Sequence, residues 1–421
     1  MAKIDDSVKK KVPELRFPGF TDDWEERKLT DVTYSYSGLT YSPTDVQDKG
    51  TFVLRSSNVK NDQLIDADNV YVNPDVVNSN NVKVGDVIVV VRNGSRSLIG
   101  KHAIVTKEMP HTVIGAFMSA FRGENGDYIN ALLSTNNFQK EVHKSLGATI
   151  NQITGKDFSM MNFLTPKLEE QNKIGSFFKQ LDNTIALHQR KLDLLKEQKK
   201  GFLQKMFPKN GAKVPELRFA GFADDWEERK LGDTETHFTD GNYGESYPST
   251  KDMSDKANGI PFLRGSDFSN GYLDSSNANY IKPEKHAELT SGHIKQDDIV
   301  LAVRGSLGTL GYATKENEGW NINSQLAILR TNKSEISGMF LIQYLLGSKG
   351  QKEIFSRNTG TALKQLPIKQ LKDIPVPVPT LLEQQKIGNF FKELDSTIAL
   401  HQRKLDLLKE QKKGFLQKMF V

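Results

Sequence analysis

Two arginines follow apolar runs in stretches of the chain that carry no acidic residue. Arg92 follows VIVVV within the acid-free stretch 87–107, and Arg304 follows IVLAV within the acid-free stretch 299–315. A guanidinium can donate a fork of hydrogen bonds to guanine, and an Asn or Gln amide can pair with adenine in a similar way. Neighbouring glycine and serine allow the backbone to approach a phosphate closely. These residue types predict two local sites of contact with DNA.

We place the candidate DNA contacts on three loops in each half of the chain. In the first half they are Arg55, Ser56, Asn58, Arg92, Asn93, Ser95, Arg96, Lys101, Asn151 and Gln152. In the second half they are Arg264, Ser266, Asp267, Arg304, Ser306, Lys364 and Gln365. For any single position, the alternative is an ordinary turn residue with a solvent-exposed polar tip.

No catalytic or cofactor-binding motif accompanies these loops. The segment from Gly94 to Lys101 has five residues between its glycines where a P-loop has four, and His102 replaces the magnesium-binding Ser or Thr. The absence of cysteine excludes thiolate metal sites, and the chain contains no HExxH motif. We therefore expect a chain that is not an enzyme by itself and binds no cofactor or metal.

Two nearly identical segments frame each half of the chain. Residues 11–31 recur at 213–233 with 18 of 21 positions identical, and residues 168–207 recur at 381–420 with 35 of 40 identical. The regions between them share only short, scattered segments of similar sequence. A common frame around divergent inserts suggests one shared task for the frame and two different tasks for the inserts. Recent duplication followed by drift is the alternative.

The repeat divides the chain into six parts. They are a frame segment at 1–31, a globular domain at 32–165, a long helix at 166–212, a second frame segment at 213–233, a second globular domain at 234–378 and a final long helix at 379–421. Each globular domain is predicted to open with strands and to close with helices, at 128–146 and 338–355, which gives a mixed α/β fold.

Charge is distributed unevenly over these parts. The first globular domain holds 12 basic and 12 acidic residues and the second holds 16 of each, so the net charge of +5 lies in the frame. Contact between the globular domains and DNA must then depend on basic side chains that are clustered locally.

The two frame helices carry the seam of a coiled coil. Apolar or core-compatible residues recur in alternating steps of four and three. The seam positions are Ile174, Phe178, Leu181, Ile185, His188, Leu192 and Leu195 in the first helix, and Ile387, Phe391, Leu394, Ile398, His401, Leu405 and Leu408 in the second. We predict antiparallel packing about a pseudo-two-fold axis near His188 and His401. A polar layer that sets the register is expected there, and metal binding or pH sensing is the alternative.

The length of the seam is also informative. From residue 174 to residue 206 it would extend roughly 50 Å at 1.5 Å per residue. One turn of B-DNA measures about 34 Å. The helices are therefore expected to act as a ruler that holds two domains more than one turn of DNA apart.

The frame resembles that of the specificity subunit of type I restriction–modification systems. The resemblance is carried by the helix openings Pro-x-Leu-x-Glu-Gln-x-Lys-Ile at 166–174 and 379–387, the repeated HQRKLDLLKEQKKGFLQKMF and the repeated PELRF-x-GF-x-DDWEERKL. It covers almost the whole chain. It implies that residues 32–165 and 234–378 are target-recognition domains, each reading one half of an asymmetric, split site in double-stranded DNA.

The resemblance also implies partners. Two modification subunits would dock on the frame and supply methyl transfer from S-adenosylmethionine, and restriction subunits would add translocation and cleavage that depend on ATP and magnesium. The polar N-terminus and the lack of cysteine favour a cytoplasmic protein without a membrane segment. Two other functions stay open: a protein-interaction scaffold with two binding domains spaced by a coiled coil, and a self-sufficient methyltransferase or nuclease.

Overall fold

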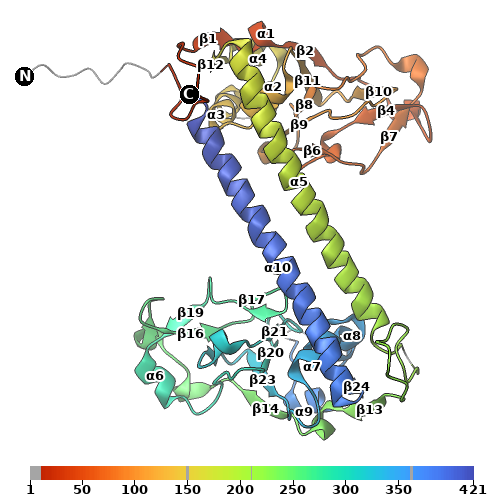
Figure 1. Ribbon diagram of the computed structural model, residues 1–421, viewed down its shortest axis with the longest axis vertical. Helices are drawn as coiled ribbons and strands as arrows, with labels where there is room; N and C mark the ends of the chain where they lie inside the picture. Colours follow the sequence, from red (N-terminus) through yellow and green to blue (C-terminus); the bar gives the residue numbers. More distant parts are fainter. Residues whose placement is uncertain (1–10, 148–150, 210, 361–363) are drawn as a thin grey trace, which may run out of the picture. The chain divides into compact units, whose positions relative to one another are not determined.

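Two long helices, α5 (Leu168–Lys205) and α10 (Leu381–Lys418), run through both of the compact units into which the chain folds (Figure 1). The computed structural model describes residues 11–147, 151–209, 211–360 and 364–421. Unit 1 comprises Met1–Gln189 and Arg403–Val421, and unit 2 comprises Arg190–Gln402. Each unit thus combines one globular region with a part of both long helices.

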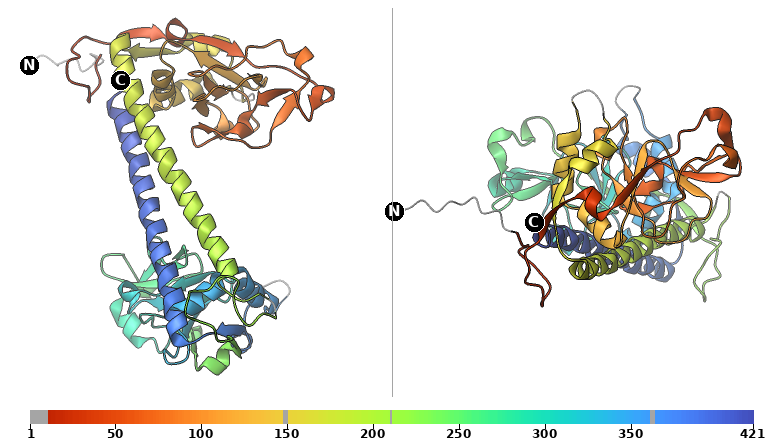
Figure 2. Two further views of the ribbon diagram at one scale, coloured as in Figure 1. Left: turned by 45° about the vertical axis from the view of Figure 1, so that its right-hand side comes forward. Right: turned by 90° about the horizontal axis from the view of Figure 1, so that it is seen from above.

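Unit 1 contains two four-stranded sheets. The antiparallel sheet β2-β11-β8-β9 is formed by β2 (Tyr34–Ser37), β11 (Met118–Arg122), β8 (Val87–Val90) and β9 (His102–Ile104). The sheet β10-β4-β7-β3 is formed by β10 (Thr112–Ile114), β4 (Thr51–Leu54), β7 (Val70–Val72) and β3 (Val46–Gln47), and β10 runs parallel to β4. Two ribbons pair β1 (Glu25–Lys28) with β12 (Asn162–Thr165) and β5 (Val59–Lys60) with β6 (Gln63–Leu64). The shorter helices are α1 (Leu29–Val32), α2 (Gly126–Leu133), α3 (Asn136–Ser145) and α4 (Gly155–Met160). In the view from above, the sheets lie to one side of this unit's two long-helix segments (Figure 2).

Unit 2 repeats this plan with a wider first sheet. The sheet β14-β23-β20-β21-β18-β17 is formed by β14 (His237–Asp240), β23 (Leu326–Arg330), β20 (Ile299–Ala302), β21 (Leu310–Tyr312), β18 (Tyr272–Leu273) and β17 (Phe268–Ser269). The sheet β15-β19-β16-β22 is formed by β15 (Met253–Ser254), β19 (Asn279–Ile281), β16 (Ile260–Leu263) and β22 (Asn321–Ile322), and β13 (Glu227–Lys230) pairs with β24 (Pro375–Val378). Its shorter helices are α6 (Pro283–Glu288), α7 (Gly338–Leu346), α8 (Ser348–Ser356) and α9 (Ile368–Lys372). The predicted mixed α/β fold, with helices near the end of each globular region, is confirmed.

Strands β8 and β20 are covered on both faces, which explains their uninterrupted apolar sequence. In β8, Val87 and Val89 belong to the core formed with the helices, whereas Ile88 and Val90 belong to the core against the second sheet. Successive side chains of a strand point to opposite faces, so a strand between two cores needs an apolar residue at every position. Strand β20 alternates between two cores in the same way.

A buried aspartate precedes each of these strands. Asp86 accepts hydrogen bonds from Arg122 Nε and Nη2, both at 2.7 Å, and from the backbone N–H of Lys83 at 2.7 Å. In unit 2, Asp298 accepts from Arg330 at 2.8 and 2.7 Å, and it likewise caps the preceding turn. The acidic residues that open both acid-free stretches are therefore structural.

The repeated frame closes the core of each unit. In unit 1 the indole of Trp24 packs edge-on against Phe420, two residues beyond the end of α10, with the ring centroids 6.2 Å apart. In unit 2 Trp226 packs in the same way against Phe207, two residues beyond the end of α5, again at 6.2 Å. The closing phenylalanine of each unit thus stands at an equivalent position of the repeat.

A matched ion pair attaches each frame segment to its helix. Arg16 donates to both carboxylate oxygens of Glu170 at 2.7 and 2.8 Å, and Arg218 donates to Glu383 at the same two distances. The two carboxylates are only 2% and 0% exposed. Such bidentate pairs are geometrically specific, so the duplicated frame sequence has a clear structural task.

The predicted coiled-coil seam is buried or half-buried at every one of its 14 positions. In unit 1, Lys412 Nζ lies 2.7 Å from Asp182 Oδ1 and Lys409 Nζ donates to Gln189 Oε1 at 3.5 Å. Residue numbers fall along α10 as they rise along α5, so these segments are antiparallel, as predicted. Burial raises the pKa of Asp182, and Lys412 opposes the shift.

The helix segments of unit 2 are antiparallel as well. Lys199 Nζ lies 2.6 Å from Asp395 Oδ1, and Lys196 Nζ donates to Gln402 Oε1 at 3.5 Å. The polar layer that we expect at His188 and His401 would join one residue of each unit, and it stays a prediction. No helix in the described ranges is long and apolar enough to cross a membrane.

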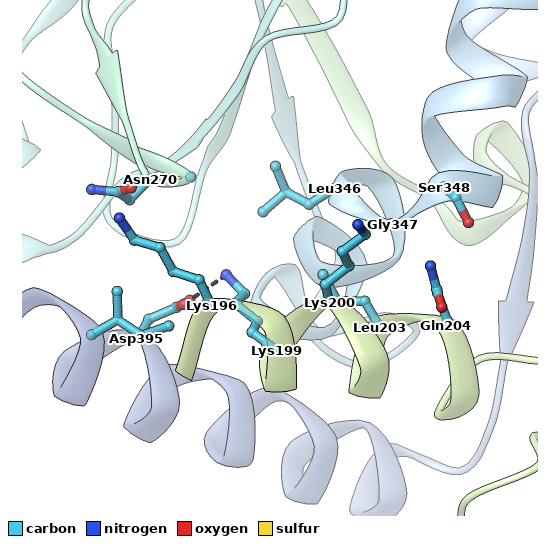
Figure 3. A pocket seen from close by; sticks show the side chains of 12 residues that line it. Lys196, Lys199, Lys200, Leu203, Gln204, Asn270, Leu346, Gly347, Ser348 and Asp395 are labelled. Atoms are coloured by element: carbon cyan, nitrogen blue, oxygen red, sulfur yellow. Dashed lines mark ion pairs between the residues drawn. The ribbon is translucent and has the colours of Figure 1, made fainter. Parts of the chain in front are cut away.

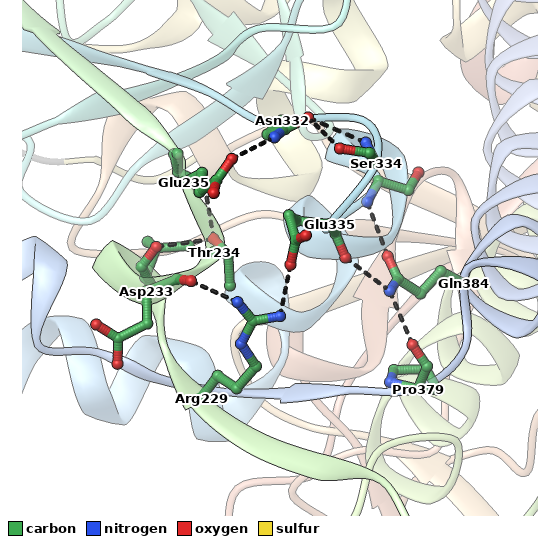
Figure 4. A network of polar contacts seen from close by, with 12 residues as sticks. Arg229, Asp233, Thr234, Glu235, Asn332, Ser334, Glu335, Pro379 and Gln384 are labelled. Carbon is green, nitrogen blue, oxygen red and sulfur yellow. Dashed lines mark hydrogen bonds and ion pairs between the residues drawn. The ribbon is translucent and has the colours of Figure 1, made fainter.

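The start of α10 is anchored by polar contacts inside unit 2 (Figure 4). The Gln384 side chain accepts from the backbone N–H of Ser337 at 2.8 Å and donates to Pro379 O at 2.9 Å. Arg229 Nη1 donates to Glu335 Oε2 at 2.7 Å, which ties the frame strand β13 to the same corner. The helix is therefore fixed to the domain that carries the second set of predicted DNA contacts.

Candidate nucleic-acid interface

Three loops of unit 1 meet just beyond strand β8, and we call them loop cluster 1. Arg92 forms an isolated β-bridge with Gln152, and the backbone N–H of Asn93 donates to Asn151 O at 3.4 Å. The side-chain amide of Asn93 donates to Ser56 Oγ at 3.3 Å. The structure therefore brings together the three loops that the sequence singles out.

Loop cluster 2 forms in the same way beyond strand β20. Arg304 makes an isolated β-bridge with Gln365, and its Nε donates to Gln365 Oε1 at 3.1 Å. A Cβ atom added to Gly265 would lie 3.2 Å from Cβ of Ser306, so the loop after β16 lies against the loop after β20. Lys364 is exposed beside Gln365.

The arginine of each cluster lies over an aromatic ring. Arg92 Cζ is 5.0 Å from the centroid of Phe117, and Arg304 Cζ is 5.4 Å from the centroid of Tyr243. A ring face attracts a guanidinium and orients its plane while leaving N–H groups at the edge for a ligand. No ion pair involving either arginine occurs among the residues that the structure describes. Both clusters thus present an oriented cation whose charge no salt bridge compensates.

Two predicted contacts are buried, and for them the prediction of direct DNA contact is wrong. Asn58 is 0% exposed and Asp267 is 3% exposed. Asn58 Oδ1 accepts from the backbone N–H of Arg55 at 2.9 Å, and Asp267 Oδ2 accepts from that of Arg264 at 2.8 Å. Both side chains close the same turn from within, so they position the loops.

Arg55 and Arg264 also take part in holding these turns. Arg55 Nη2 lies 2.6 Å from Asp68 Oδ2, and Arg264 Nη2 lies 3.2 Å from Asp267 Oδ1. Arg264 Nη2 donates in addition to Asn277 O at 2.6 Å. Both charges are already neutralised by carboxylates. Arg304 also uses donors within its cluster, since its Nη1 donates to the Tyr243 hydroxyl at 3.3 Å and to Ser324 O at 3.4 Å, but neither partner is charged. Arg92 and Arg304 therefore keep an uncompensated charge that Arg55 and Arg264 do not.

The other predicted contacts remain accessible, and their contact with DNA stays a prediction. Those that are exposed are Ser95, Arg96, Lys101, Ser266, Ser306 and Lys364, and those that are half-buried are Ser56, Asn93, Asn151, Gln152 and Gln365.

The loop after the central strand is longer in unit 1. The N–H of Gly100 returns to Val90 O at 2.9 Å, and the N–H of Gly308 returns to Ala302 O at 2.9 Å, so these glycines are equivalent. The additional residues of unit 1 include Arg96, whose Nη2 donates to Leu146 O at 3.3 Å. Loop cluster 1 therefore has a second exposed arginine for which loop cluster 2 has no counterpart.

Loop cluster 2 has its own distinguishing charge. Asp240, the last residue of β14, is half-buried near Arg304. Burial raises the pKa of Asp240, and Arg304 opposes this shift. The equivalent residue at the end of β2 is Ser37, because both strands pair in the same register with β11 and β23.

Phe117, Tyr243 and Gln325 are exposed parts of the clusters that the sequence interpretation missed. Phe117 is 53% and Tyr243 is 44% exposed. They lie next to the arginines because the backbones of distant loops cross there. Exposed aromatic residues in loops were the available sequence signal, but spacing alone does not connect them with the strand ends.

A separate hollow of about 500 Å³ lies between α5 and the turn that joins α7 to α8 (Figure 3). Lys196, Lys199 and Lys200 line it together with Asn270, and Lys199 is already paired with Asp395. None of the predicted DNA contacts lines this hollow, so we assign it no part in the loop clusters.

Potential metal ligands are not clustered in the described residues. No set of three or more His, Cys, Asp or Glu side chains is arranged to hold an ion there. His286 and His293 have ring centroids 4.5 Å apart, but Nδ1 of His286 is buried and Nε2 of His293 contacts Leu289 O at 2.8 Å. Burial and the neighbouring His293 both lower the pKa of His286.

Comparison with known proteins gives consistent matches along the chain. The family model of the type I restriction modification DNA specificity domain matches twice, over residues 21–197 and 223–410. A type I restriction enzyme specificity subunit from Methanocaldococcus jannaschii is 25% identical over 410 residues, which cover 94% of this chain and 92% of that protein. The StySPI specificity subunit of Salmonella potsdam is 25% identical over 384 residues, covering 86% and 80%. The crystal structure of the S subunit of a type I restriction-modification system from M. genitalium is similar in fold, with a TM-score of 0.67, 16% identity and coverage of 97% of this chain and 99% of that one.

Proposed function

The chain belongs to the family of type I restriction–modification DNA specificity subunits, and on this basis we propose that its two units read the two halves of a split, asymmetric DNA site. As a specificity subunit it recognises DNA sequence and is not itself catalytic. The observation that supports the two-part site is the presence of one loop cluster per unit, each with an arginine oriented over an aromatic ring and free of ion pairs within the described ranges.

The clusters differ in the groups that they present, which supports an asymmetric site. Loop cluster 1 has the second arginine Arg96, whereas loop cluster 2 has Asp240 near its single strand-end arginine. Because base edges in the major groove present distinct donors and acceptors, different side chains select different bases. The two halves of the site should therefore differ in sequence.

The alternatives raised by the sequence are not favoured. A protein-interaction scaffold would not require matching arginine platforms at the same position of both units. A self-sufficient methyltransferase or nuclease is at odds with the specificity family, in which modification and cleavage belong to other subunits.

Four exposed leucines offer a docking surface for the modification subunits. Leu187 and Leu194 on α5 are 63% and 52% exposed, and Leu400 and Leu407 on α10 are 61% and 54% exposed. Each pair is spaced by seven residues and occupies the same positions of the repeat. Exposed leucines at equivalent positions of the two helices would be buried by partners of one kind, so the two pairs would recruit two modification subunits.

The remaining partners and cofactors follow from this assignment. S-adenosylmethionine would be bound by the modification subunits, and ATP and magnesium by restriction subunits, with the assembly in the cytoplasm. The long helices would space the two half-sites on double-stranded DNA.

A footprint tests the proposed recognition. The full chain, purified with its modification subunits, should protect two short blocks of DNA separated by an unprotected gap. One continuous block, or no protection, would contradict the proposal.

Docking is tested separately by the mass of the assembly. Replacing Leu187 and Leu194 together with glutamate should remove one modification subunit from the complex, and the matched pair Leu400→Glu and Leu407→Glu should remove the other. Exposed Lys173→Glu, 14 residues before Leu187 on α5, serves as a charge control that lies outside both leucine pairs. Full retention of both subunits by the leucine variants would rule out this surface.

A further inference from the structure

Phe117 and Gln325 occupy one equivalent position in the two loop clusters. The backbone N–H groups of Val91 and Arg92 both donate to Phe117 O, at 2.9 and 3.2 Å. The corresponding groups of Val303 and Arg304 both donate to Gln325 O, again at 2.9 and 3.2 Å. Each residue is therefore held beside the strand-end arginine by the same pair of hydrogen bonds, although the two side chains are chemically unlike.

At a second equivalent position the difference is reversed: the aromatic residue, Tyr243, is in unit 2, and unit 1 has Thr40 there. A Cβ atom on Gly38 would lie 2.0 Å from Gly115 O, and one on Gly241 would lie 2.2 Å from Asn323 O. Only glycine allows these backbones to cross so closely. Thr40 in unit 1 and Tyr243 in unit 2 each stand two residues beyond the crossing glycine.

Together, the differences at these two positions leave an aromatic ring beneath the strand-end arginine in both units. In unit 1 the ring beneath Arg92 comes from Phe117, and in unit 2 the ring beneath Arg304 comes from Tyr243. Tyr243 is anchored by its hydroxyl, which donates to Ser324 O at 3.0 Å. Because Tyr243 supplies the ring in unit 2, the position equivalent to Phe117 is released for a different task.

Gln325 is exposed, and its side chain has little internal bonding. Its Oε1 accepts one long hydrogen bond from Asn323 Nδ2 at 3.5 Å, and no acceptor for its own amide N–H groups occurs in the described part of the chain. Its amide also lies beside Gly305, which has no side chain to cover it. A carboxamide at such a position can donate and accept hydrogen bonds at the edge of adenine.

We infer that Phe117 and Gln325 are base-reading residues, and that the difference between them gives the two half-sites different bases next to the base read by the strand-end arginine. Gln325 would select adenine through its amide, whereas Phe117 would select thymine through apolar contact with the thymine methyl group. This inference rests on the proposed function of the loop clusters and names the residue position that makes their specificities differ.

The test exchanges the two side chains in the full complex. Wild type, Phe117→Gln and Gln325→Phe are each purified with the modification subunits of the host. Methylation is then measured on double-stranded DNA in which every base pair of the mapped site is replaced in turn. Phe117→Gln should move the preference at one base pair of the first half-site from thymine to adenine, and Gln325→Phe should cause the reverse change in the second half-site.

Each exchange should alter discrimination at that one base pair about 5- to 150-fold, since a good base contact contributes about 1–3 kcal/mol. The other half-site should be read as in wild type. Phe117→Leu, which keeps an apolar side chain without the ring, should retain the thymine preference. A matched control is Val84→Gln, because Val84 is 56% exposed and precedes β8, at the far end of the strand from Arg92.

The outcomes separate the inference from the proposed function. Equal weakening on every DNA sequence by Phe117→Gln, or the same loss with Phe117→Leu, would show that the ring serves only as a platform for Arg92 and would overturn the inference. Failure of the wild-type complex to methylate any split site would instead refute the proposed function.

Discussion

In unit 1, Asp86 accepts two hydrogen bonds from Arg122 in front of strand β8, and in unit 2 Asp298 accepts the same two from Arg330 in front of β20. At the other end of these strands the backbone contacts are again shared, but the exposed side chains differ. Arg92 rests on Phe117, whereas the equivalent arginine rests on a tyrosine from another loop. Buried polar contacts have few alternatives once formed, while exposed loop tips can change without loss of the scaffold. The difference suggests that the shared contacts carry stability and that the divergent ones carry specificity.

The largest effect should come from removal of the shared carboxylates of Asp86 and Asp298. We expect Asp86→Ala and Asp298→Ala each to lower the free energy of unfolding by about 3 kcal/mol, because a partly buried arginine loses its partner and a turn loses its cap. Urea unfolding of the two variants measures the effect, and Asp86→Asn, which retains one acceptor oxygen, should lose less. A large loss in one unit with none in the other would show that the scaffolds are not equivalent.

Removal of the divergent arginine contacts should act on specificity and leave stability unchanged. Arg92→Ala should weaken recognition of one half-site by about 1–3 kcal/mol, and Arg304→Ala should do the same for the other half. Methylation of DNAs altered in one half at a time measures this separation. Lysine at either position keeps the charge without the fork of donors, so it should restore affinity more than discrimination. Uniform weakening on all sequences would assign the arginine to phosphate contact.

The same division explains which features could be predicted from the sequence. The seam from Ile174 to Leu195 was predictable because a 3.5-residue period is a local pattern that packing must respect. The apolar runs before Arg92 and Arg304 predicted strands for a similar reason. The meeting of the three loops in each unit depends instead on contacts between distant segments, such as the bridges of Arg92 with Gln152 and of Arg304 with Gln365.

The residues that were misjudged or missed depend on contacts between distant segments. Asn58 looks like an exposed turn residue in the sequence RSSN, yet its amide caps the turn from the interior and donates to Ala67 O at 2.6 Å. Phe117 and Tyr243 reach the arginines only because Gly38 and Gly241 let two loops cross. Neither burial of a single polar side chain nor a crossing of backbones leaves a periodic signal.

The two frame tryptophans, Trp24 and Trp226, should differ by a smaller amount in how much they stabilise the protein. Trp24 Nε1 donates to Glu170 Oε2 at 3.2 Å, whereas Trp226 Nε1 is buried without a hydrogen-bond partner among the described residues. Replacing either with phenylalanine removes similar volume, but only Trp24→Phe also removes a hydrogen bond. We expect Trp24→Phe to destabilise the protein by about 1 kcal/mol more than Trp226→Phe, as measured by thermal unfolding. Equal losses would mean that the two frames are energetically identical at this corner.

The smallest expected effect concerns the charge beside the second arginine. Burial raises the pKa of Asp240 above its ordinary value, with Arg304 opposing the shift. As the pH falls from neutral, Asp240 should therefore take up a proton before ordinary exposed aspartates do. Loss of its negative charge removes repulsion of DNA phosphates, so binding to the second half-site should strengthen, by less than about 1 kcal/mol for such a partly solvated group.

Reciprocal variants assign this pH dependence to the residue. Asp240→Asn should strengthen binding to the second half-site at neutral pH and abolish its extra pH dependence, whereas Ser37→Asp should create such a dependence for the first half-site. Binding is compared on DNAs that each retain one intact half-site, so protonation elsewhere in the protein affects both measurements alike. If wild type binds the two half-sites with the same pH profile, Asp240 does not influence the DNA contact, and the clusters differ only in their neutral side chains and in Arg96.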